Sequence, residues 1–461
     1  MSTPTNPKIL AREGDAGPTD LWAQATEVRA GRRHAAEAME AAIAAAEGPA
    51  CRHAYVRRFD TMARAAAAAV DAGRQAGAPV PPLAGLAVSI KDLFDVAGVP
   101  STAASRSLAD AAPAGSDCPA VARLRAAGAA LSGHTNLTEF AFSGIGINPH
   151  HGTPANVATA RLDATPRIPG GSTSGGAVTV ASGAAWAALG SDTRGSIRVP
   201  AALHGLVGFK NTQALTPTEG CLPLSFTLDT TCAITRSVRD AVLLHEVLAA
   251  RRVRLRRRPL RALRLALPTG PMLDGLDDGV ARAFERSLRR LRAAGAEIVD
   301  RPLPDSDIPW TSSGQISAVE AWAWHRGRLE ARHADYDPRV LTRIRGGGSI
   351  AAADYIDRLQ LRRRWIAQVE QMATDIDAFV CPTVPIVAPP LQPLLQDDEA
   401  FFATNALLLR NPSVVNHLDG CALSLPCQAP DELPVGLMVW APGGHDDAVL
   451  DISLAIEQAL H

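Results

Sequence analysis

The spacing of apolar residues predicts helices in the first part of the chain, after an opening segment without periodicity. Residues 1–18 mix proline, glycine and charged residues, and we expect them to form a flexible N-terminal tail. Asp20 has the side chain of a helix cap, and alanine-rich segments at 32–47 and 59–77 carry apolar residues at helical spacing. We therefore expect residues 19–77 to form helices that pack on the outside of a larger core.

The pattern changes after the prolines near residue 80, where short apolar runs alternate with helical segments. Residues 83–90 form a mostly apolar run, which predicts a buried strand. A helix at 121–127 and a strand at 130–132 follow, and the alternation continues along the chain. This order indicates an α/β fold over 78–461, built as a single large domain with a central mixed β-sheet and helices on both faces.

A later region is predicted to be mainly helical. An amphipathic helix at 277–294 and a strand at 297–299 precede it, and residues 309–374 then carry no strand pattern. Four of the seven tryptophans lie there, namely Trp310, Trp322, Trp324 and Trp365. They can pack between helices or line an apolar pocket, and packing is the simpler interpretation.

Acidic and basic residues balance almost completely, with 46 Lys and Arg against 47 Asp and Glu among 461 residues. The net charge of −1 gives no general attraction to nucleic acid or anionic membranes. Residues 251–264 differ, because their eight arginines form either a nucleic-acid patch or a solvated linker into a strand at 263–267. The linker is preferred, since no aromatic residue is interleaved with the arginines.

Cysteine usage and the absence of long apolar runs predict a cytoplasmic protein. The seven cysteines contain no C-x-x-C pair and their number is odd, which argues against a disulfide scaffold or a structural zinc site. The first residues lack the apolar stretch of a secretory signal. No run of about 18 uncharged apolar residues predicts a membrane span. We expect neither a metal nor a cofactor.

Two loops of small residues, at 170–176 and 190–196, are the most informative part of the chain. Residues 177–188 between them are predicted to form a tightly packed helix. Because glycine is costly in backbone entropy, such loops indicate unusual backbone conformations or close approach to a ligand. Ser196 follows Thr-Arg-Gly, where consecutive backbone N–H groups can stabilise charge that develops on a carbonyl oxygen. Ser196 is therefore a candidate nucleophile, provided that a base removes its proton.

The base for this serine can be a histidine or a lysine. Histidine is the usual partner, but none of the twelve histidines stands in an obvious triad motif. Lys91 ends the apolar run at 83–90, where burial would favour a neutral amine that acts as a base. A lone lysine is more often a surface residue, and a glycine loop can also bind phosphate. The phosphate alternative is disfavoured because Ala177, not lysine, follows the last glycine.

Three segments around these residues resemble the amidase signature family. That family carries a glycine- and serine-rich loop, a GxDxxGSxRxPA block and an upstream lysine in a VxxKD-type motif. The matching residues here are 170–176, 190–201 and 88–92. Weaker matches extend the resemblance over roughly residues 20–460 and lie at 83–88, 133–141, 204–210, 381–385 and 433–437.

The resemblance implies the amidase signature fold and a Ser-cisSer-Lys triad. By motif, Ser196 is the nucleophile, Ser172 is a bridging serine on a cis peptide bond, and Lys91 is the ultimate base. The implied reaction hydrolyses a carboxamide through an acyl-enzyme. Backbone groups would form the oxyanion hole and part of the substrate site, and the matching residues are Thr193, Arg194, Gly195, Ser196 and Ala141.

Three residues depart from the family pattern. Arg194 replaces a common glycine, and its guanidinium could reach the substrate and favour an acidic one. Asn211 replaces a common proline, which indicates a local turn effect. His134 replaces a common lysine and is expected to be remote from the triad. The divergent helical region at 309–375 is expected to shape the substrate pocket.

Three functions remain open at this stage. The first is a stand-alone amidase for linear amides. The second is a subunit of the amidotransferase that converts misacylated glutamyl-tRNA, which uses the same fold. A catalytically silent binding protein is disfavoured because all three triad residues are present. The expected partner is a small-molecule amide, with a homodimer left open and neither nucleic acid nor a membrane expected.

Overall fold

The computed structural model describes residues 19–304 and 307–460, of which 307–310 are described as backbone only. The tail expected at 1–18 lies outside these residues. The strands are β1 (Tyr55–Arg58), β2 (Ala87–Lys91), β3 (Ala130–Thr135), β4 (Ala187–Ser191), β5 (Val207–Lys210), β6 (Thr231–Thr235), β7 (Arg264–Leu267), β8 (Glu297–Asp300), β9 (Ala378–Pro382), β10 (Cys421–Pro426) and β11 (Gly436–Ala441).

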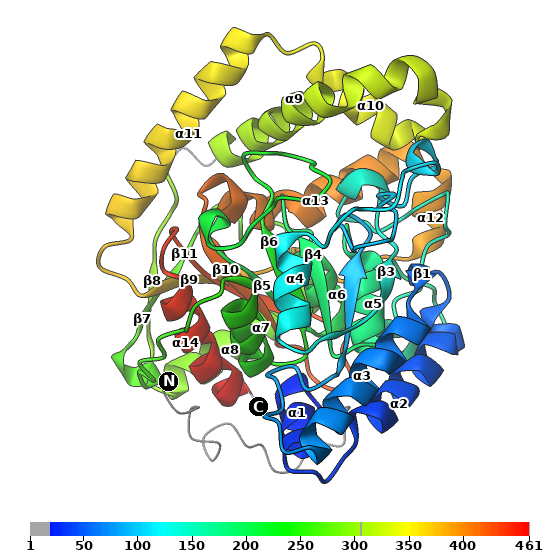
Figure 1. Cartoon of the computed structure of the whole chain (residues 1–461). Coiled ribbons are helices and arrows are strands. Elements are labelled where there is room, and N and C mark those ends of the chain that lie inside the picture. Colours follow the sequence, from blue (N-terminus) through cyan, green and yellow to red (C-terminus); the bar gives the residue numbers. More distant parts are fainter. Residues whose placement is uncertain (1–18, 305–306, 461) are drawn as a thin grey trace.

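Within the described residues, all of these strands belong to one sheet, in the order β1-β3-β2-β4-β6-β5-β10-β11-β9-β7-β8 (Figure 1). Strands β3, β2 and β4 are parallel to one another, and so are β9, β7 and β8. The other neighbours are antiparallel. The expected mixed sheet of an α/β fold is therefore confirmed.

Helices cover both faces of the sheet, as expected. They are α1 (Leu21–Arg29), α2 (Ala35–Glu47), α3 (Asp60–Gln75), α4 (Pro119–Ala126), α5 (Ser174–Ser182), α6 (Arg198–His204), α7 (Val238–Leu248), α8 (Asp278–Ala293), α9 (Asp307–Arg332), α10 (Pro338–Gly347), α11 (Ala352–Met372), α12 (Leu391–Gln396), α13 (Asp398–His417) and α14 (Asp446–Leu460). Residues of α4, α7, α8 and α14 pack on one face, and residues of α5, α6, α11 and α13 pack on the other.

Successive side chains of each strand point to opposite faces of the sheet, and here each face is covered by helices. In β11, Leu437 and Val439 join the cluster with α8 and α14, whereas Met438 and Trp440 join the cluster with α11 and α13. All four side chains are fully buried. Both faces of the strand are therefore apolar, which explains why such strands are continuous hydrophobic runs in the sequence.

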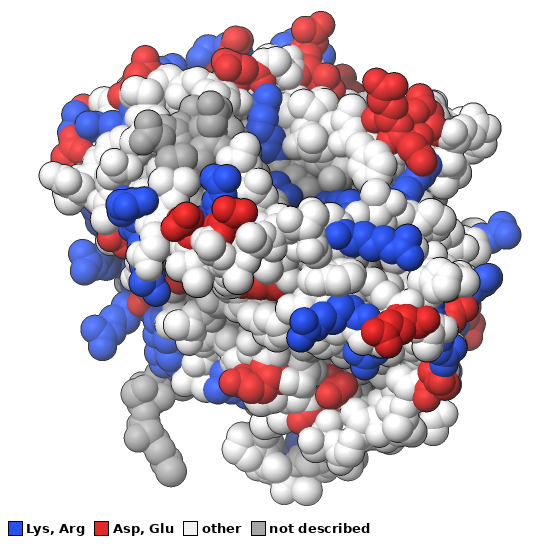
Figure 2. All heavy atoms as spheres, turned by 90° about the horizontal axis from the view of Figure 1, so that it is seen from above, with Lys and Arg blue, Asp and Glu red and all other residues white. Residues whose placement is uncertain are grey.

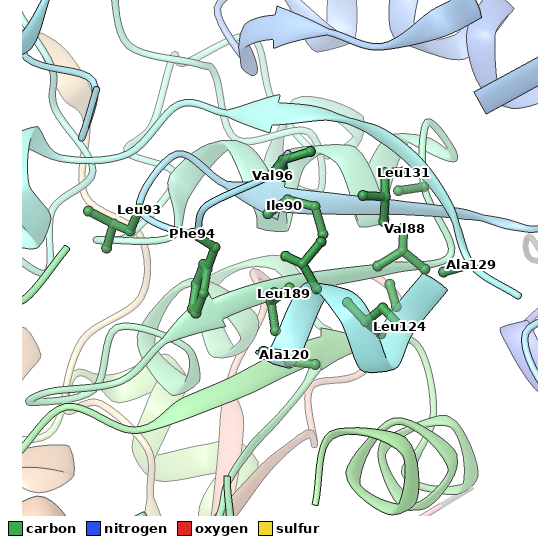
Figure 3. Packing of buried hydrophobic residues seen from close by; sticks show 14 of the residues in the cluster. Val88, Ile90, Leu93, Phe94, Val96, Ala120, Leu124, Ala129, Leu131 and Leu189 are labelled. Atoms are coloured by element: carbon green, nitrogen blue, oxygen red, sulfur yellow. The ribbon is translucent and has the colours of Figure 1, made fainter. Parts of the chain in front are cut away.

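The sheet around β2 packs tightly against α4. Val88 and Ile90 of β2 and Leu189 of β4 lie close to Ala120 and Leu124 of α4 (Figure 3). Strands β3 and β4 pair with β2 on its two sides. Lys91, which ends β2, therefore lies in the interior of the sheet, between β3 and β4.

The N-terminal helices pack on the same part of the core. Asp20 caps α1 by accepting a hydrogen bond from the backbone N–H of Ala23 at 2.9 Å. Leu21, Met39 and Ala67, one from each of the first three helices, are fully buried in the cluster that contains β2. These helices therefore contribute to the hydrophobic core directly.

Two sequence predictions of element boundaries are wrong. The helix predicted at 177–188 ends at Ser182, because Gly183 adopts a left-handed conformation with φ of +90°. The chain then enters β4, where residues 187–191 pair with β2 and β6. The strand predicted from residue 83 begins at Ala87, because the residues before it form a turn.

The predicted helical region at 309–374 is confirmed as α9, α10 and α11. In Figure 1, α9 and α10 lie across the top of the molecule with α13 beneath them, and α11 descends along the upper left side. Helix α9 packs against α10, α11 and α13. Trp365 is fully buried and donates to the Pro304 carbonyl at 2.8 Å, which fits the packing interpretation for this tryptophan.

The arginine-rich segment forms surface ion pairs. Arg251 pairs with Asp447, Arg252 with Glu246, and Arg258 with Asp377. These contacts agree with the linker interpretation of the segment. Basic and acidic side chains are also interspersed over the face in Figure 2. No helix of the described residues is long and apolar enough to cross a membrane.

Candidate active site

Lys91 is the last residue of β2, and its side chain is fully buried. Its Nζ donates to Ser172 Oγ at 2.8 Å and to Ser191 Oγ at 3.0 Å. Burial lowers the pKa of the Lys91 ammonium from 10.5 to about 8, although nearby thiols and carboxylates, Cys221 and Asp229 first among them, oppose this shift. The neutral amine is therefore accessible near pH 8 and can accept a proton from Ser172.

Ser172 lies in the glycine-rich loop that leads into α5, and it is fully buried. The peptide bond between Gly171 and Ser172 is cis, as the family resemblance implies. A Cβ on Gly171 would lie 2.7 Å from the backbone nitrogen of Gly146. Only glycine fits there, so the glycine density of this loop reflects close backbone packing beside Ser172.

Ser196 lies between β4 and α6 and is 4% exposed. The backbone N–H of Thr173 donates to the Ser196 carbonyl at 3.3 Å, so the two small-residue loops lie side by side. Among the described residues, the Ser196 hydroxyl has no hydrogen-bond partner. The structure thus brings together the three predicted triad residues and leaves the Ser196 hydroxyl free to react.

A buried ion pair holds the Ser196 loop. Asp192 accepts from the Arg198 guanidinium at 2.9 and 3.0 Å, and both side chains are fully buried. Asn416 of α13 also donates to Asp192, at 2.9 Å. Burial alone would raise the pKa of Asp192, but the charges of Arg198 and Lys210 and these hydrogen bonds lower it. The carboxylate therefore stays ionised and ties the loop to α6 and α13.

The oxyanion donors expected in this loop are not equivalent. The Gly195 N–H donates to Asp192 Oδ1 at 2.8 Å and is therefore already occupied. The N–H groups of Thr193, Arg194 and Ser196 have no acceptor among the described residues. Gly195 has φ of +120°, and a Cβ there would lie 2.6 Å from Pro412. Gly195 thus sets the shape of the loop, and the backbone N–H groups of Thr193, Arg194 and Ser196 are the ones left to donate to an oxyanion.

Ala141 lies in a tight turn next to Ser172. Its φ is +62°, and its carbonyl accepts from the Ser143 N–H at 3.2 Å. Thr138, in the same turn, donates its backbone N–H to the Ser172 carbonyl at 3.2 Å. The turn therefore adjoins Ser172, as expected for a turn predicted to form part of the substrate site.

Ser191 is a site residue that the sequence-based prediction missed. It is the second acceptor of the Lys91 ammonium, and it sits at the end of β4, which pairs with β2. The GSD run that contains it is a usable signal, but its glycine and serine predict a loop rather than the end of a strand. The parallel pairing of β2 and β4 is what carries Ser191 to the lysine.

His134 lies closer to the site than the sequence predicts. Its Nδ1 is 3.1 Å from Asp92 Oδ1, and its Nε2 contacts the Phe94 carbonyl at 3.1 Å. Asp92 directly follows Lys91, so His134 supports the turn after β2. Asn211 fits its expected turn role, because its side chain donates to the Thr212 carbonyl at 2.8 Å and to Thr216 Oγ1 at 2.9 Å.

A separate cavity of about 280 Å³ lies beside the end of α11 and the end of β11. Its lining includes Asp377, Phe379 and His445, but none of the three triad residues. In the part of the chain that the structure describes, no group of three or more His, Cys, Asp or Glu side chains could hold a metal ion.

Removing the Asp192 carboxylate is expected to destabilise the fold strongly. In Asp192→Asn, the fully buried Arg198 loses its counter-charge, which costs about 3–5 kcal/mol. The measurement is urea unfolding at pH 7. The control is Glu27→Gln, whose partner Arg32 is 60% exposed and whose loss should change stability little. Equal unfolding midpoints for the two variants would contradict this expectation.

Comparison with known proteins gives consistent matches over most of the chain. A family model described as Amidase matches residues 37–450. The chain is 35% identical over 412 residues to the 2-amino-5-chloromuconic acid deaminase of Comamonas testosteroni, covering 88% of each protein. It is 32% identical to a glutamyl-tRNA(Gln) amidotransferase subunit of Salinispora arenicola strain CNS-205, covering 88% of this chain and 90% of that one.

The fold is also similar to that of a solved amidase. A crystal structure of an amidase matches with a TM-score of 0.86 and 32% identity, and the match covers 96% of this chain and 100% of the other. The match therefore includes the sheet, both covering layers and the helices above them.

Proposed function

This chain belongs to the amidase family, and from that membership we propose that it hydrolyses the C–N bond of a carboxamide with Ser196 as the nucleophile. The products are a carboxylate and ammonia or an amine. The relative in Comamonas testosteroni is named a deaminase, which favours ammonia as the released group. The helical region at 309–375 is proposed to shape the substrate site.

In the proposed cycle, neutral Lys91 starts the proton relay. Lys91 Nζ accepts the proton of Ser172, and Ser172 Oγ accepts the proton of Ser196 as Ser196 Oγ bonds to the amide carbon. The carbonyl electron pair moves onto oxygen, where the free N–H groups of the Ser196 loop stabilise the negative charge. The result is a tetrahedral intermediate with a protonated Lys91.

Collapse of this intermediate breaks the C–N bond. The relay returns a proton to the leaving nitrogen, and the acyl group stays on Ser196 as an ester. Water then attacks the ester carbon and gives its proton to the relay. The C–O bond to Ser196 breaks, the carboxylic acid leaves, and Ser196 regains its proton.

One observation carries this proposal, namely the hydrogen bond between Lys91 Nζ and Ser172 Oγ at 2.8 Å. Both residues are fully buried, and burial depresses the pKa of the lysine. A surface lysine would remain protonated at neutral pH and could not act as a base. The alternative of a snorkelling surface lysine is therefore wrong for Lys91.

The test is a panel of linear amides, ureas and esters, incubated with the purified chain alone. Release of ammonia or amine, together with a transient mass increase on Ser196 in intact-protein spectra, is the expected result. Activity without added proteins also separates a stand-alone amidase from one component of an amidotransferase. The latter stays the second candidate because of the 32% identity to such a protein.

The activity of the enzyme is expected to rise with pH. Below the Lys91 pKa of about 8 the amine is protonated and cannot accept a proton, so kcat/KM should increase about tenfold per pH unit from pH 6 to 7. It should level off above pH 8 to 9. Initial rates between pH 5.5 and 10 provide the measurement, with circular dichroism to check folding. An inflection near pH 6.5 would instead indicate a histidine base.

We place the enzyme in the cytoplasm, where its thiols stay reduced. The structure describes the seven cysteines as free, and six of them as buried. A homodimer is compatible with this proposal, since the triad comes entirely from one chain. Size-exclusion chromatography of the active protein tests that point.

A further inference from the structure

Arg194 extends from the nucleophile loop towards the helices above it. It stands two residues before Ser196, and its Nε donates to Ser413 Oγ of α13 at 3.1 Å. A Cβ on Gly314 of α9 would lie 3.3 Å from Arg194 Nη1. The missing side chain at Gly314 therefore leaves room for the guanidinium between α9 and α13.

A second arginine approaches from α10. The Arg343 Cζ lies 5.3 Å from the centre of the Phe142 ring, just after the turn that contains Ala141. Its Nη1 is buried and has no hydrogen-bond partner among the described residues. The charge of Arg343 acts on Arg194, so the two guanidinium groups are within electrostatic range of each other.

Neither arginine has a counter-ion in the part of the chain that the structure describes. Burial lowers the pKa of Arg194 to about 10, with a further contribution from Arg343, and burial alone lowers that of Arg343 to about 10. No acidic side chain contributes to either pKa. Both side chains are half-buried, and two like charges that water screens only in part are unfavourable in a folded protein unless an anion pairs with them.

Other polar atoms on α9 and α13, the two helices that flank Arg194, also lack partners. Ser312 Oγ, Ser313 Oγ and Gln315 Oε1, which flank Gly314 on α9, are buried without a hydrogen bond to any described residue. Both ring nitrogens of His417 are unpaired too, and burial, assisted by the charges of Arg362 and Arg194, lowers the pKa of His417 to about 3. Buried polar atoms are normally satisfied, so a polar ligand between α9 and α13 would supply partners that the described residues lack.

We infer that Arg194 and Arg343 bind a carboxylate of the substrate, so that the enzyme acts on amides that also carry a carboxylate. The inference rests on the proposed function for Ser196. Guanidinium groups suit a planar carboxylate because they can donate two parallel N–H bonds. The monoamides of dicarboxylic acids are the simplest substrates of this class.

The first test compares malonamate, succinamate and glutaramate with the corresponding neutral diamides. For the wild-type chain, kcat/KM should be at least about tenfold higher for the best anionic substrate than for its diamide. In Arg343→Met this ratio should fall at least tenfold, mainly through KM. Arg343→Lys should retain part of it. Arg345→Met is the matched control, because it removes an exposed arginine from the same helix and should leave the ratio unchanged.

A binding test separates this inference from the proposed reaction. The dicarboxylates from malonate to adipate are titrated into the wild-type chain and into Arg343→Met by calorimetry. At least one of these dicarboxylates should bind the wild type at least tenfold more tightly than it binds Arg343→Met. Because Arg343 is an unpaired charge, Arg343→Met should unfold at no lower a temperature than the wild type, which excludes a folding defect.

The outcomes are distinct. A wild type without preference for anionic amides, or dicarboxylates that bind both chains equally or neither, would overturn the inference even if amides are cleaved. Dicarboxylate binding that depends on Arg343 without amide cleavage would overturn the proposed reaction and keep the anion site.

Discussion

Replacing Ser196 by alanine is expected to lower kcat by about 10⁴-fold or more, with KM changed by only a few-fold. In the proposed reaction this hydroxyl makes the covalent bond to the acyl group, and its loop carries the backbone N–H groups without acceptors among the described residues. Loss of a serine nucleophile typically removes nearly all covalent catalysis while the oxyanion donors and substrate contacts remain. The result is a folded chain that still binds its substrate.

The measurement is the turnover of the best amide by Ser196→Ala, together with intact-protein mass spectra. The matched variant is Ser191→Ala, which removes another serine hydroxyl from the same segment. Ser191 only accepts a hydrogen bond from Lys91, at 3.0 Å, so its loss should cost about ten- to a hundredfold. If Ser196→Ala kept more than a few per cent of wild-type turnover, the nucleophile would have to be sought elsewhere.

Replacing Lys91 by methionine is expected to lower kcat by about 10³-fold or more without lowering stability. The activity falls because the relay loses its base. Stability should hold because the folded chain lowers the lysine pKa from 10.5 to about 8, which corresponds to about 3 kcal/mol of destabilisation when the amine is charged. Methionine fills a similar volume and carries no charge that must be desolvated.

The pH dependence of this stability difference has a definite sign. A lysine with a lowered pKa in the folded state binds fewer protons there than in the unfolded state between about pH 8 and 10.5. The wild type should therefore be less stable than Lys91→Met near pH 7. The difference in their free energies of unfolding should shrink as the pH rises through this interval. Urea unfolding of both chains at pH 7 and pH 10 is the measurement.

Lys210 provides the control for this experiment. It is also fully buried, but its Nζ donates to two backbone carbonyls, those of Asn211 at 2.9 Å and Gly420 at 2.7 Å. Lys210→Met leaves both carbonyls without this donor, so it should lose stability while keeping most of its turnover per folded molecule. The interpretation of Lys91 would be contradicted if both variants lost stability alike and Lys91→Met stayed active.

The sequence alone determined the class of fold and supplied the candidates for the reacting groups. The change from helical spacing to short apolar runs near residue 80 predicts the buried strand that ends at Lys91. The two glycine-rich loops predict serines in tight backbone surroundings. These features are local, because periodicity and turn chemistry depend on neighbouring residues. They made Ser196 a candidate nucleophile and Lys91 a candidate base, and the resemblance to the amidase signature family added Ser172.

Only the tertiary structure decided how these groups are surrounded. The segment at 177–188 has helix-like composition, yet its second half becomes β4 because it pairs with β2 and β6. That pairing brings Ser191 to Lys91, and α13 supplies Asn416 to Asp192 from far along the chain. Packing of α10 likewise brings Arg343 within electrostatic range of Arg194 in the Ser196 loop. Such contacts arise from long-range packing and burial, which no local pattern contains.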